Sequence, residues 1–153
     1  MKERFLACVF SLFVAFLFAS PAVAQRNVAP AIDRDPLMET DAKHNLDVAW
    51  QGFTLKKAYK QVILRFEETF AAYPEFSKID EFLYLAGMSS YYLSDNKGRQ
   101  KVDLKSAKEK EKFAPAKLKE DATMYLSMLV DKHPDSKYKD EAEKTLQLLK
   151  GEK

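Results

Sequence analysis

The most reactive side chains in this 153-residue sequence are two histidines, His44 and His133, and one cysteine, Cys8. The histidines lie in different segments, and each has a structural explanation. His44 and Asp47 are three positions apart, which suits a polar pair on one helix face better than half a metal site. His133 directly precedes a proline at a predicted helix end, where a protonatable ring complements the helix dipole. We expect neither catalysis nor metal binding from these residues.

The carboxylate pairs lack the apolar surroundings that would raise a pKa for acid–base catalysis. Glu67-Glu68 and the pair Glu109 and Glu111 fall in polar stretches, where a solvated surface is the simpler explanation. The sequence also lacks a glycine-rich phosphate loop, zinc-ligand spacing and a basic stripe interleaved with aromatic residues. It therefore predicts no enzyme, no cofactor and no nucleic-acid partner.

The first 24 residues have the pattern of a cleaved secretory signal peptide. Lys2 and Arg4 precede an apolar run at 5–19, and Ala22-Val23-Ala24 provides small residues at the −3 and −1 positions of a cleavage site. As a helix the run would reach only about 22 Å, short of the roughly 30 Å hydrocarbon core, which argues against a permanent membrane span. We expect an exported protein whose mature chain begins at Gln25.

Cys8 bears on the question of a lipid anchor. The preceding Phe5-Leu6-Ala7 is similar to a lipidation box, but a lipidated cysteine should close the apolar run, and residues 9–19 continue it. We interpret Cys8 as an apolar residue of the signal peptide. The mature chain would then have no thiol, and so no disulfide and no thiolate metal site.

Composition predicts one helical domain with almost balanced charge. The sequence has 25 Lys and Arg against 23 Asp and Glu, and removal of residues 1–24 leaves 23 against 22, a formal net charge of +1. This balance is not the footprint of a protein that binds nucleic acid or an anionic lipid surface. Glycine is scarce, and the later prolines separate stretches rich in Leu, Ala, Lys and Glu. The chain is predicted to be all-α.

Apolar residues recur with helical spacing in five segments that follow a flexible linker at 25–36. The predicted helices cover about 37–53, 55–73, 77–94, 115–133 and 136–150. Thr54 and Ser77 are the candidate N-caps of the second and third helices. A charged insertion near 95–114 is expected to be mobile or a solvated extension of the third helix. Residues 37–153 would thus form one domain of about five helices in antiparallel pairs.

Two proline-containing segments repeat each other. Residues 70–81 and 130–141 each contain a helix end, an aromatic residue or His before Pro, a Ser-Lys pair and an Asp-Glu pair. Their prolines, Pro74 and Pro134, are 60 residues apart (134 − 74), against about 34 for a tetratricopeptide helix pair. The charged insertion accounts for most of the difference. Stacked pairs must share one core, because no pair can bury its apolar stripe alone.

Three motifs are more specific than this repeat. They are residues 42–46 (AKHNL), residues 57–66 (KAYKQVILRF) followed by Tyr73-Pro74, and residues 129–138 (LVDKHPDSKY). They resemble the BamD family of outer-membrane assembly lipoproteins, over about residues 40–94 and 115–150. The sequence departs from that family in the place of its cysteine and in the number of repeats. The resemblance implies a tetratricopeptide-like α-solenoid in the periplasm or at the inner face of the outer membrane, where it helps to insert β-barrel proteins.

In stacked helix pairs the first helix of each pair lines the concave face. The protein-binding groove predicted on this basis comprises His44, Asp47, Gln51, Glu81, Tyr84, Met88, Tyr91 and Tyr92. Tyr and Met provide large contact areas with polar or adaptable tips, which suits the binding of a peptide segment. The alternative is that Tyr84 and Met88 are core residues packed against the last helices.

The sequence therefore predicts a non-catalytic scaffold that binds other envelope proteins, possible partners including the outer-membrane barrel-assembly machinery. Two alternatives stay open: a periplasmic adaptor for cell-wall or division proteins, and a helical carrier of an apolar ligand. An enclosed cavity between the third and fourth helices would favour the carrier, whereas an open groove would favour the adaptor. The oligomeric state is not indicated.

Overall fold

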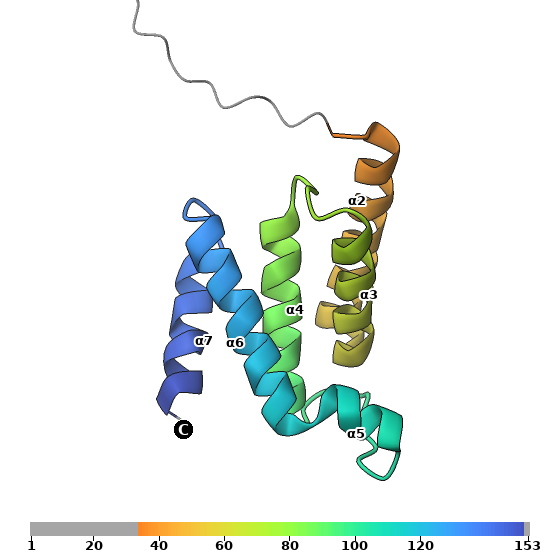
Figure 1. Cartoon of the computed structure of the whole chain (residues 1–153), viewed down its shortest axis with the longest axis vertical. Coiled ribbons are helices and arrows are strands. Elements are labelled where there is room, and N and C mark those ends of the chain that lie inside the picture. Colours follow the sequence, from red (N-terminus) through yellow and green to blue (C-terminus); the bar gives the residue numbers. More distant parts are fainter. Residues whose placement is uncertain (1–33, 152–153) are drawn as a thin grey trace, which may run out of the picture. The chain divides into compact units, whose positions relative to one another are not determined.

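The computed structural model describes residues 34–151, which form a stack of helices (Figure 1). The helices are α2 (Pro36–Gln51), α3 (Tyr59–Ala72), α4 (Ile79–Ser94), α5 (Ala107–Phe113), α6 (Pro115–Lys132) and α7 (Lys139–Gly151), with a π-helical turn, η2 (Gly52–Lys56), after α2. No strand occurs within residues 34–151, so the predicted all-α, tetratricopeptide-like fold is confirmed. The predicted signal peptide and most of the predicted linker lie outside the described residues.

Five of these helices correspond to the five predicted from apolar spacing, and α5 is an addition. α2 begins at Pro36, because the carboxylate of Asp35 caps it by accepting hydrogen bonds from the backbone N–H groups of Leu37 (2.8 Å) and Met38 (3.4 Å). Proline suits this first position, where its missing N–H costs nothing. None of the helices between residues 34 and 151 combines the length and apolar character needed to cross a membrane.

The prediction that Thr54 caps the second helix is wrong. Thr54 lies in η2, and its hydroxyl donates to the carbonyl of Trp50 at the end of α2 (2.7 Å), whereas α3 begins only at Tyr59. The chain turns instead through Lys57, whose φ of 49° is left-handed. Gly52 keeps the turn close to α3, since a Cβ there would lie 3.2 Å from a methyl group of Val62.

The prediction that Ser77 caps the third helix is also wrong. α4 begins at Ile79, and its N-cap residue, Lys78, makes no side-chain capping bond. The hydroxyl of Ser77 donates to the carboxylate of Glu39 on α2, and its backbone N–H lies 3.3 Å from both oxygens of the same group. Ser77 therefore ties the turn before α4 to α2.

The two proline turns have the same backbone hydrogen bonds, which supports the internal repeat. The N–H of Tyr73, before Pro74, donates to the carbonyl four residues earlier at 2.8 Å, and that of His133, before Pro134, does so at 2.9 Å. In each turn the carbonyl of the same residue then accepts from the N–H three positions on, at 3.4 Å and 3.0 Å. Proline ends each helix because it lacks a donor and disfavours helical geometry in the residue before it.

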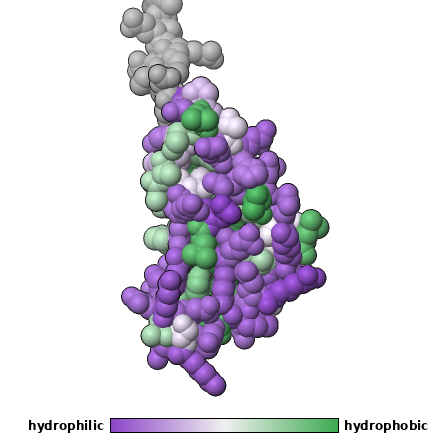
Figure 2. Space-filling view, turned by 90° about the vertical axis from the view of Figure 1, so that its right-hand side faces the viewer, coloured by the Kyte–Doolittle hydropathy of each residue, from purple (hydrophilic) through white to green (hydrophobic). Residues whose placement is uncertain are grey.

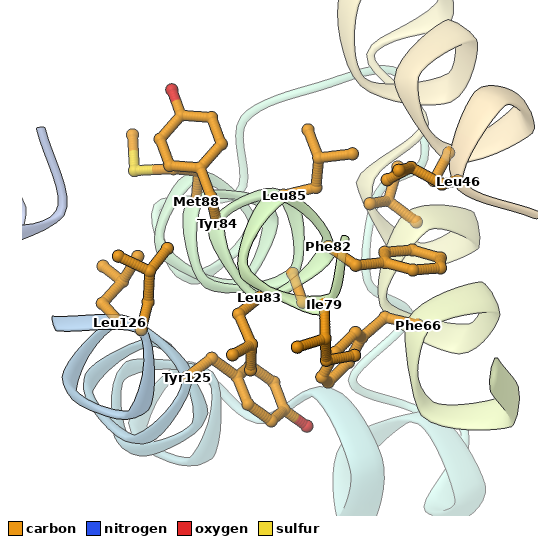
Figure 3. Close-up of a cluster of buried hydrophobic side chains, with 14 of the residues drawn as sticks. Leu46, Phe66, Ile79, Phe82, Leu83, Tyr84, Leu85, Met88, Tyr125 and Leu126 are labelled. Atoms are coloured by element: carbon orange, nitrogen blue, oxygen red, sulfur yellow. The ribbon is translucent and has the colours of Figure 1, made fainter. Parts of the chain in front are cut away.

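α4 is the centre of the hydrophobic core, and its side chains radiate toward the surrounding helices (Figure 3). Every residue from Phe82 to Ser90 is buried, as the apolar character of nearly the whole helix surface predicted. α6 packs against α4 so closely at Gly87 that a Cβ there would lie 2.6 Å from Cγ of Leu126. Phe66 of α3 is 1 % exposed, and its ring centroid lies 5.5 Å from that of Phe82 and 4.9 Å from that of Tyr125.

The charged segment 95–114 is not an extension of α4, contrary to prediction, because α4 ends at Ser94 and α5 packs against α3. Phe113 is 6 % exposed and joins a second apolar cluster with Tyr59, Ile63, Leu93 and Leu118. The spacing did not predict this because one aromatic residue at the end of a polar run has no periodic partner in the sequence.

Backbone and side-chain bonds attach the insertion to the start of α3. The N–H of Arg99 donates to the carbonyl of Lys57 at 3.0 Å, and the side-chain oxygen of Gln100 accepts from the N–H of Gln61 at 3.1 Å. Gly98, with φ of 88°, is required here, since a Cβ would lie 2.6 Å from the Lys57 carbonyl oxygen. Gln100 thus supplies the capping bond that had been expected from Thr54.

Candidate functional site

Aromatic side chains from two helix pairs and from the residue before α7 form a continuous set on the α2, α4 and α7 side of the core. Its members are Trp50 of α2, Phe53 of η2, Tyr84, Tyr91 and Tyr92 of α4, and Tyr138, which directly precedes α7. We refer to these six residues as the aromatic surface. All of them except Tyr84 are only half-buried, so their ring edges reach solvent. The surface lies on the first helices of successive pairs, where a concave binding face is expected.

Trp50 is the centre of the aromatic surface. Its ring centroid lies 6.4 Å from that of Tyr84 and 6.1 Å from that of Tyr138, and these two tyrosines stack on each other at 4.5 Å. On the other side Phe53 meets Trp50 edge-on at 6.1 Å. Aromatic pairs at these distances stabilise one another beyond the area they bury, so the contacts favour this arrangement before any partner binds.

Toward the end of α4 the aromatic surface continues and meets a lysine. Phe53 lies 6.0 Å from Tyr92, which lies 5.6 Å from Tyr91. The ammonium of Lys97 sits 5.6 Å and 5.7 Å from the centroids of these two tyrosine rings, and it also pairs with Asp95 at 2.9 Å. This hydrogen-bonded pair raises the pKa of Lys97, which therefore stays charged.

The polar groups among the rings are held in place. The indole N–H of Trp50 donates to the carboxylate of Glu81 at 2.5 Å. Lys137 lies 4.8 Å from the ring centroid of Tyr138, and burial raises the pKa of that tyrosine. Burial, assisted by the neighbouring Glu141, raises the pKa of Tyr84 well above its ordinary range. The tyrosine hydroxyls therefore remain protonated and serve as hydrogen-bond donors at physiological pH.

The structure separates the predicted groove residues into three groups. Tyr84 and Met88 are 6 % and 3 % exposed, and the sulfur of Met88 accepts a hydrogen bond from Thr145 of α7, so both lie in the core. Figure 3 shows the two side chains leaving α4 on the same side. A partner could not contact Met88 without displacing α7.

The other predicted groove residues are accessible. Glu81, Tyr91 and Tyr92 are half-buried within or beside the aromatic surface, and the α2 residues His44, Asp47 and Gln51 are exposed. Within residues 34–151, the side chains of His44 and Asp47 form no hydrogen bond or ion pair, and the predicted pairing between them does not form. That the accessible residues bind a protein stays a prediction.

Sequence reasoning missed Trp50, Phe53 and Tyr138 as surface residues. Each lies on an apolar stripe of a predicted helix, a position that usually faces the core. The repeat length offered a signal, since Trp50 and Tyr84 are 34 residues apart (84 − 50), the length of one tetratricopeptide unit. Aromatic residues at equivalent positions of neighbouring repeats come side by side when the repeats stack.

The aromatic surface is the candidate binding site among the described residues. Residues 34–151 contain no group of three or more His, Cys, Asp or Glu side chains placed to hold a metal. Figure 2 shows that the side bearing α2 and α3 is mostly hydrophilic, with isolated hydrophobic side chains. That side therefore carries no broad apolar face, and the half-buried rings are the more distinctive feature.

One pocket, of about 370 Å³, bears on the carrier alternative. It lies where α3, α4 and α6 meet at their proline turns, with an apolar floor that includes Phe76 and Leu83 and with Arg34, Lys132 and His133 among its lining residues. Further along the helices the contact at Gly87 closes the space between α4 and α6. A long apolar ligand therefore has no channel along that interface.

A family model described as an outer membrane lipoprotein family, YfiO, matches residues 20–152. No curated protein and no solved structure matches the chain significantly. The matched region contains all of the described helices, and so both the aromatic surface and the insertion.

Proposed function

We propose that this chain, which belongs to the YfiO (BamD) family of outer membrane lipoproteins, is a scaffold that binds other envelope proteins during assembly of outer-membrane β-barrels. The family is non-catalytic, and membership implies an exported protein anchored at the outer membrane. The role in barrel assembly and the position of the binding site go beyond family membership and form the proposal.

The observation that carries the proposal is the aromatic surface. Its rings are fixed by one another and by the Trp50–Glu81 hydrogen bond, so little conformational entropy is lost when a partner binds. Half-buried Trp and Tyr residues dominate the energetics of many protein interfaces, because they combine large apolar area with a polar tip. Lys97 and Lys137 at its margins can meet carboxylates or carbonyl oxygens of a partner segment.

Affinity capture of the tagged full-length protein from membrane extracts of its own cells tests this function. Near-stoichiometric recovery of barrel-assembly components, identified by mass spectrometry, is the expected result. Recovery of cell-wall or division proteins alone would overturn the role in barrel assembly and support the adaptor alternative.

A matched pair of variants tests the position of the binding site. Tyr91→Ala removes a half-buried ring of the aromatic surface, whereas Leu64→Ala removes a 45 % exposed side chain of α3. We expect Tyr91→Ala to reduce recovery of the partner while it changes the free energy of unfolding by less than about 1 kcal/mol. Equal recovery with both variants would contradict the assignment of the binding site to the aromatic surface.

The pocket at the proline turns bears on the carrier alternative. Its apolar floor is lined by Phe76 and Leu83, and Arg34 and Lys132 are among its lining residues. A carrier would release a stoichiometric small apolar molecule on denaturation of the purified protein. Native mass spectrometry that shows only the polypeptide mass would count against a carrier.

A further inference from the structure

The insertion gathers unpaired positive charge at one end of the helical stack, where α5 lies (Figure 1). The bond from the Arg99 N–H to the Lys57 carbonyl joins the loop after α4 to the turn before α3. In and beside the insertion, the exposed cations without an ion-pair partner among residues 34–151 include Lys56, Lys57, Arg99, Lys105, Lys108 and Lys110. We refer to these six residues as the basic end.

Two of the four carboxylates between residues 95 and 112 are paired with other cations. Glu109 pairs with Lys60 of α3 at 2.7 Å, and Asp95 pairs with Lys97. Between residues 95 and 112, Asp103 and Glu111 are the exposed carboxylates without a recorded ion pair. The basic end is therefore strongly positive, although the whole chain has a formal net charge of only +2. The net charge alone had argued against binding to an anionic lipid surface. The fold changes this expectation because it gathers unpaired positive charges at one end of the molecule.

Two exposed leucines adjoin these cations. Leu55 is 72 % exposed and directly precedes Lys56, and Leu104 is 50 % exposed and directly precedes Lys105. An exposed apolar side chain next to lysines is suited to a membrane surface, because the leucine can enter the acyl boundary while the ammonium groups stay with the phosphates. An acidic protein would attract the cations equally well, but it would need an apolar pocket matched to each of the two leucines.

We infer that the basic end docks on a phospholipid surface that contains anionic headgroups. Membership of an outer membrane lipoprotein family places a bilayer within reach of the protein. The contact holds the insertion against the headgroups through the lysines and Arg99, and Leu104 enters the interface. The insertion thus has a role separate from the aromatic surface, which lies on other elements.

Co-sedimentation with vesicles tests the charge requirement. The full chain is compared with the triple variant Lys105→Glu/Lys108→Glu/Lys110→Glu on vesicles of phosphatidylcholine with about 30 % phosphatidylglycerol. We expect partition to fall at least about tenfold in the triple variant and to weaken in the unaltered protein as salt rises from roughly 0.05 M to 0.5 M. All variants keep the same N-terminal segment, so differences in vesicle partition between them arise from the substituted residues.

A charge-matched control makes three equal reversals away from the insertion. Lys43, Lys78 and Lys132 are exposed, lie on or beside α2, α4 and α6, and have no recorded ion pair. The control variant Lys43→Glu/Lys78→Glu/Lys132→Glu should keep the partition of the unaltered protein to within about twofold, since these side chains do not face the headgroups. An equal loss in both triple variants would overturn the inference, because it would show a response to net charge.

An environment-sensitive fluorophore locates the contact independently of affinity. Cys8 is the chain's single cysteine, so Cys8→Ala permits labelling at Leu104→Cys or, as the control, at Leu64→Cys, whose native leucine is 45 % exposed. The expected result is a blue shift of emission at position 104 on addition of anionic vesicles and none at position 64. The absence of a shift at position 104 would overturn the inference, including the case where the basic end binds an acidic protein instead.

Discussion

The packing around α4 and the insertion that contains α5 are held together in different ways. α4 is enclosed by apolar side chains from α2, α3, α6 and α7, and its surface is buried on nearly every side. The insertion is attached by one buried ring, Phe113, and by charged and backbone contacts to α3. Contacts within a shared core break together when the protein unfolds cooperatively, whereas contacts at a solvent-exposed edge can open locally while the core stays folded. We therefore expect substitutions around α4 to change the free energy of global unfolding. Substitutions in the insertion should mainly change how readily the insertion opens locally.

The largest effect should come from Phe66→Ala on the α4 side of this comparison. Phe66 is 1 % exposed and lies 5.3 Å from Phe70, besides its contacts with Phe82 and Tyr125. Removal of the ring should lower the free energy of unfolding by about 3–5 kcal/mol, as judged by denaturant melts. A loss below about 1 kcal/mol would show that the core tolerates the cavity, and would remove the contrast with the insertion.

Gly87→Ala should have the next largest effect, through overpacking. A Cβ at this position would lie 2.6 Å from Cγ of Leu126, which is fully buried and cannot move away freely. We expect a loss of about 1–3 kcal/mol in the same denaturant melts. Gly151→Ala is the matched control, because nothing lies within 4 Å of a Cβ there and alanine favours helix. Comparable losses in the two variants would contradict the role of close α4–α6 packing.

Phe113→Ala tests how the insertion that contains α5 is attached to the rest of the fold. The ring is 6 % exposed, but α5 can separate from α3 when it is lost, so no enclosed cavity should remain. We expect the global free energy of unfolding to fall by less than the roughly 3 kcal/mol typical of a buried phenylalanine. Hydrogen exchange of residues 107–113 should accelerate while that of α4 is unchanged. Accelerated exchange throughout α4 would show that the insertion is part of the main cooperative unit.

Lys112→Ala should have a smaller effect on the same attachment. Lys112 and Glu67 form an ion pair at 2.5 Å, and both side chains are more than a third exposed to solvent. Exposed pairs contribute about 0.2–1 kcal/mol, so unfolding should change by no more than this and should respond to salt. A double-mutant cycle with Glu67→Ala isolates the interaction; coupling well above this range would mean that the pair, and not Phe113, holds α5.

The smallest predicted effect is a pH dependence of the loop before α5. Hydrogen bonds from Lys60 and from the Asp103 N–H lower the pKa of Glu109. Because the folded-state pKa is lowered, these bonds stabilise the loop above the ordinary carboxyl pKa of about 4.3, and the stabilisation is lost as pH falls through the lowered value. The amide resonance of Asp103 should report this transition below about pH 4.3, and Glu109→Gln should abolish it. A midpoint above the ordinary carboxyl pKa would contradict the assignment.

The fold could be predicted where the pattern was periodic and failed where one contact decided the geometry. Apolar spacing located five helices, and Pro74 and Pro134 located the repeated turns, because both signals act within a few residues of the chain. Thr54 and Ser77 are good cap residues whose hydroxyls found other partners, Trp50 and Glu39. Such a choice depends on which groups the fold brings nearby, and local preference cannot supply that information.

The candidate site, like the fold, could be predicted only in part. The sequence identified the helix that became α4 as the source of the groove tyrosines, and it left open whether Tyr84 and Met88 are core or groove residues. α7 decides this, because it covers Met88 through Thr145 and stacks Tyr138 on Tyr84. The same stacking of repeats places Trp50 beside Tyr84 and Tyr138, and therefore in the aromatic surface. Residue type alone could not distinguish a buried ring from a half-buried one.

The sequence by itself determined that the chain is helical, where its proline turns fall and which family it belongs to, because these properties follow from local periodicity and motifs. Tertiary structure alone decided which aromatic rings reach solvent, that Gln100 rather than Thr54 caps α3, and that a nearly neutral chain presents a basic end. The physical reason is that exposure and local charge depend on contacts between distant segments. In this protein those contacts are made by the stacking of α4 between its neighbours and by the return of the insertion onto α3.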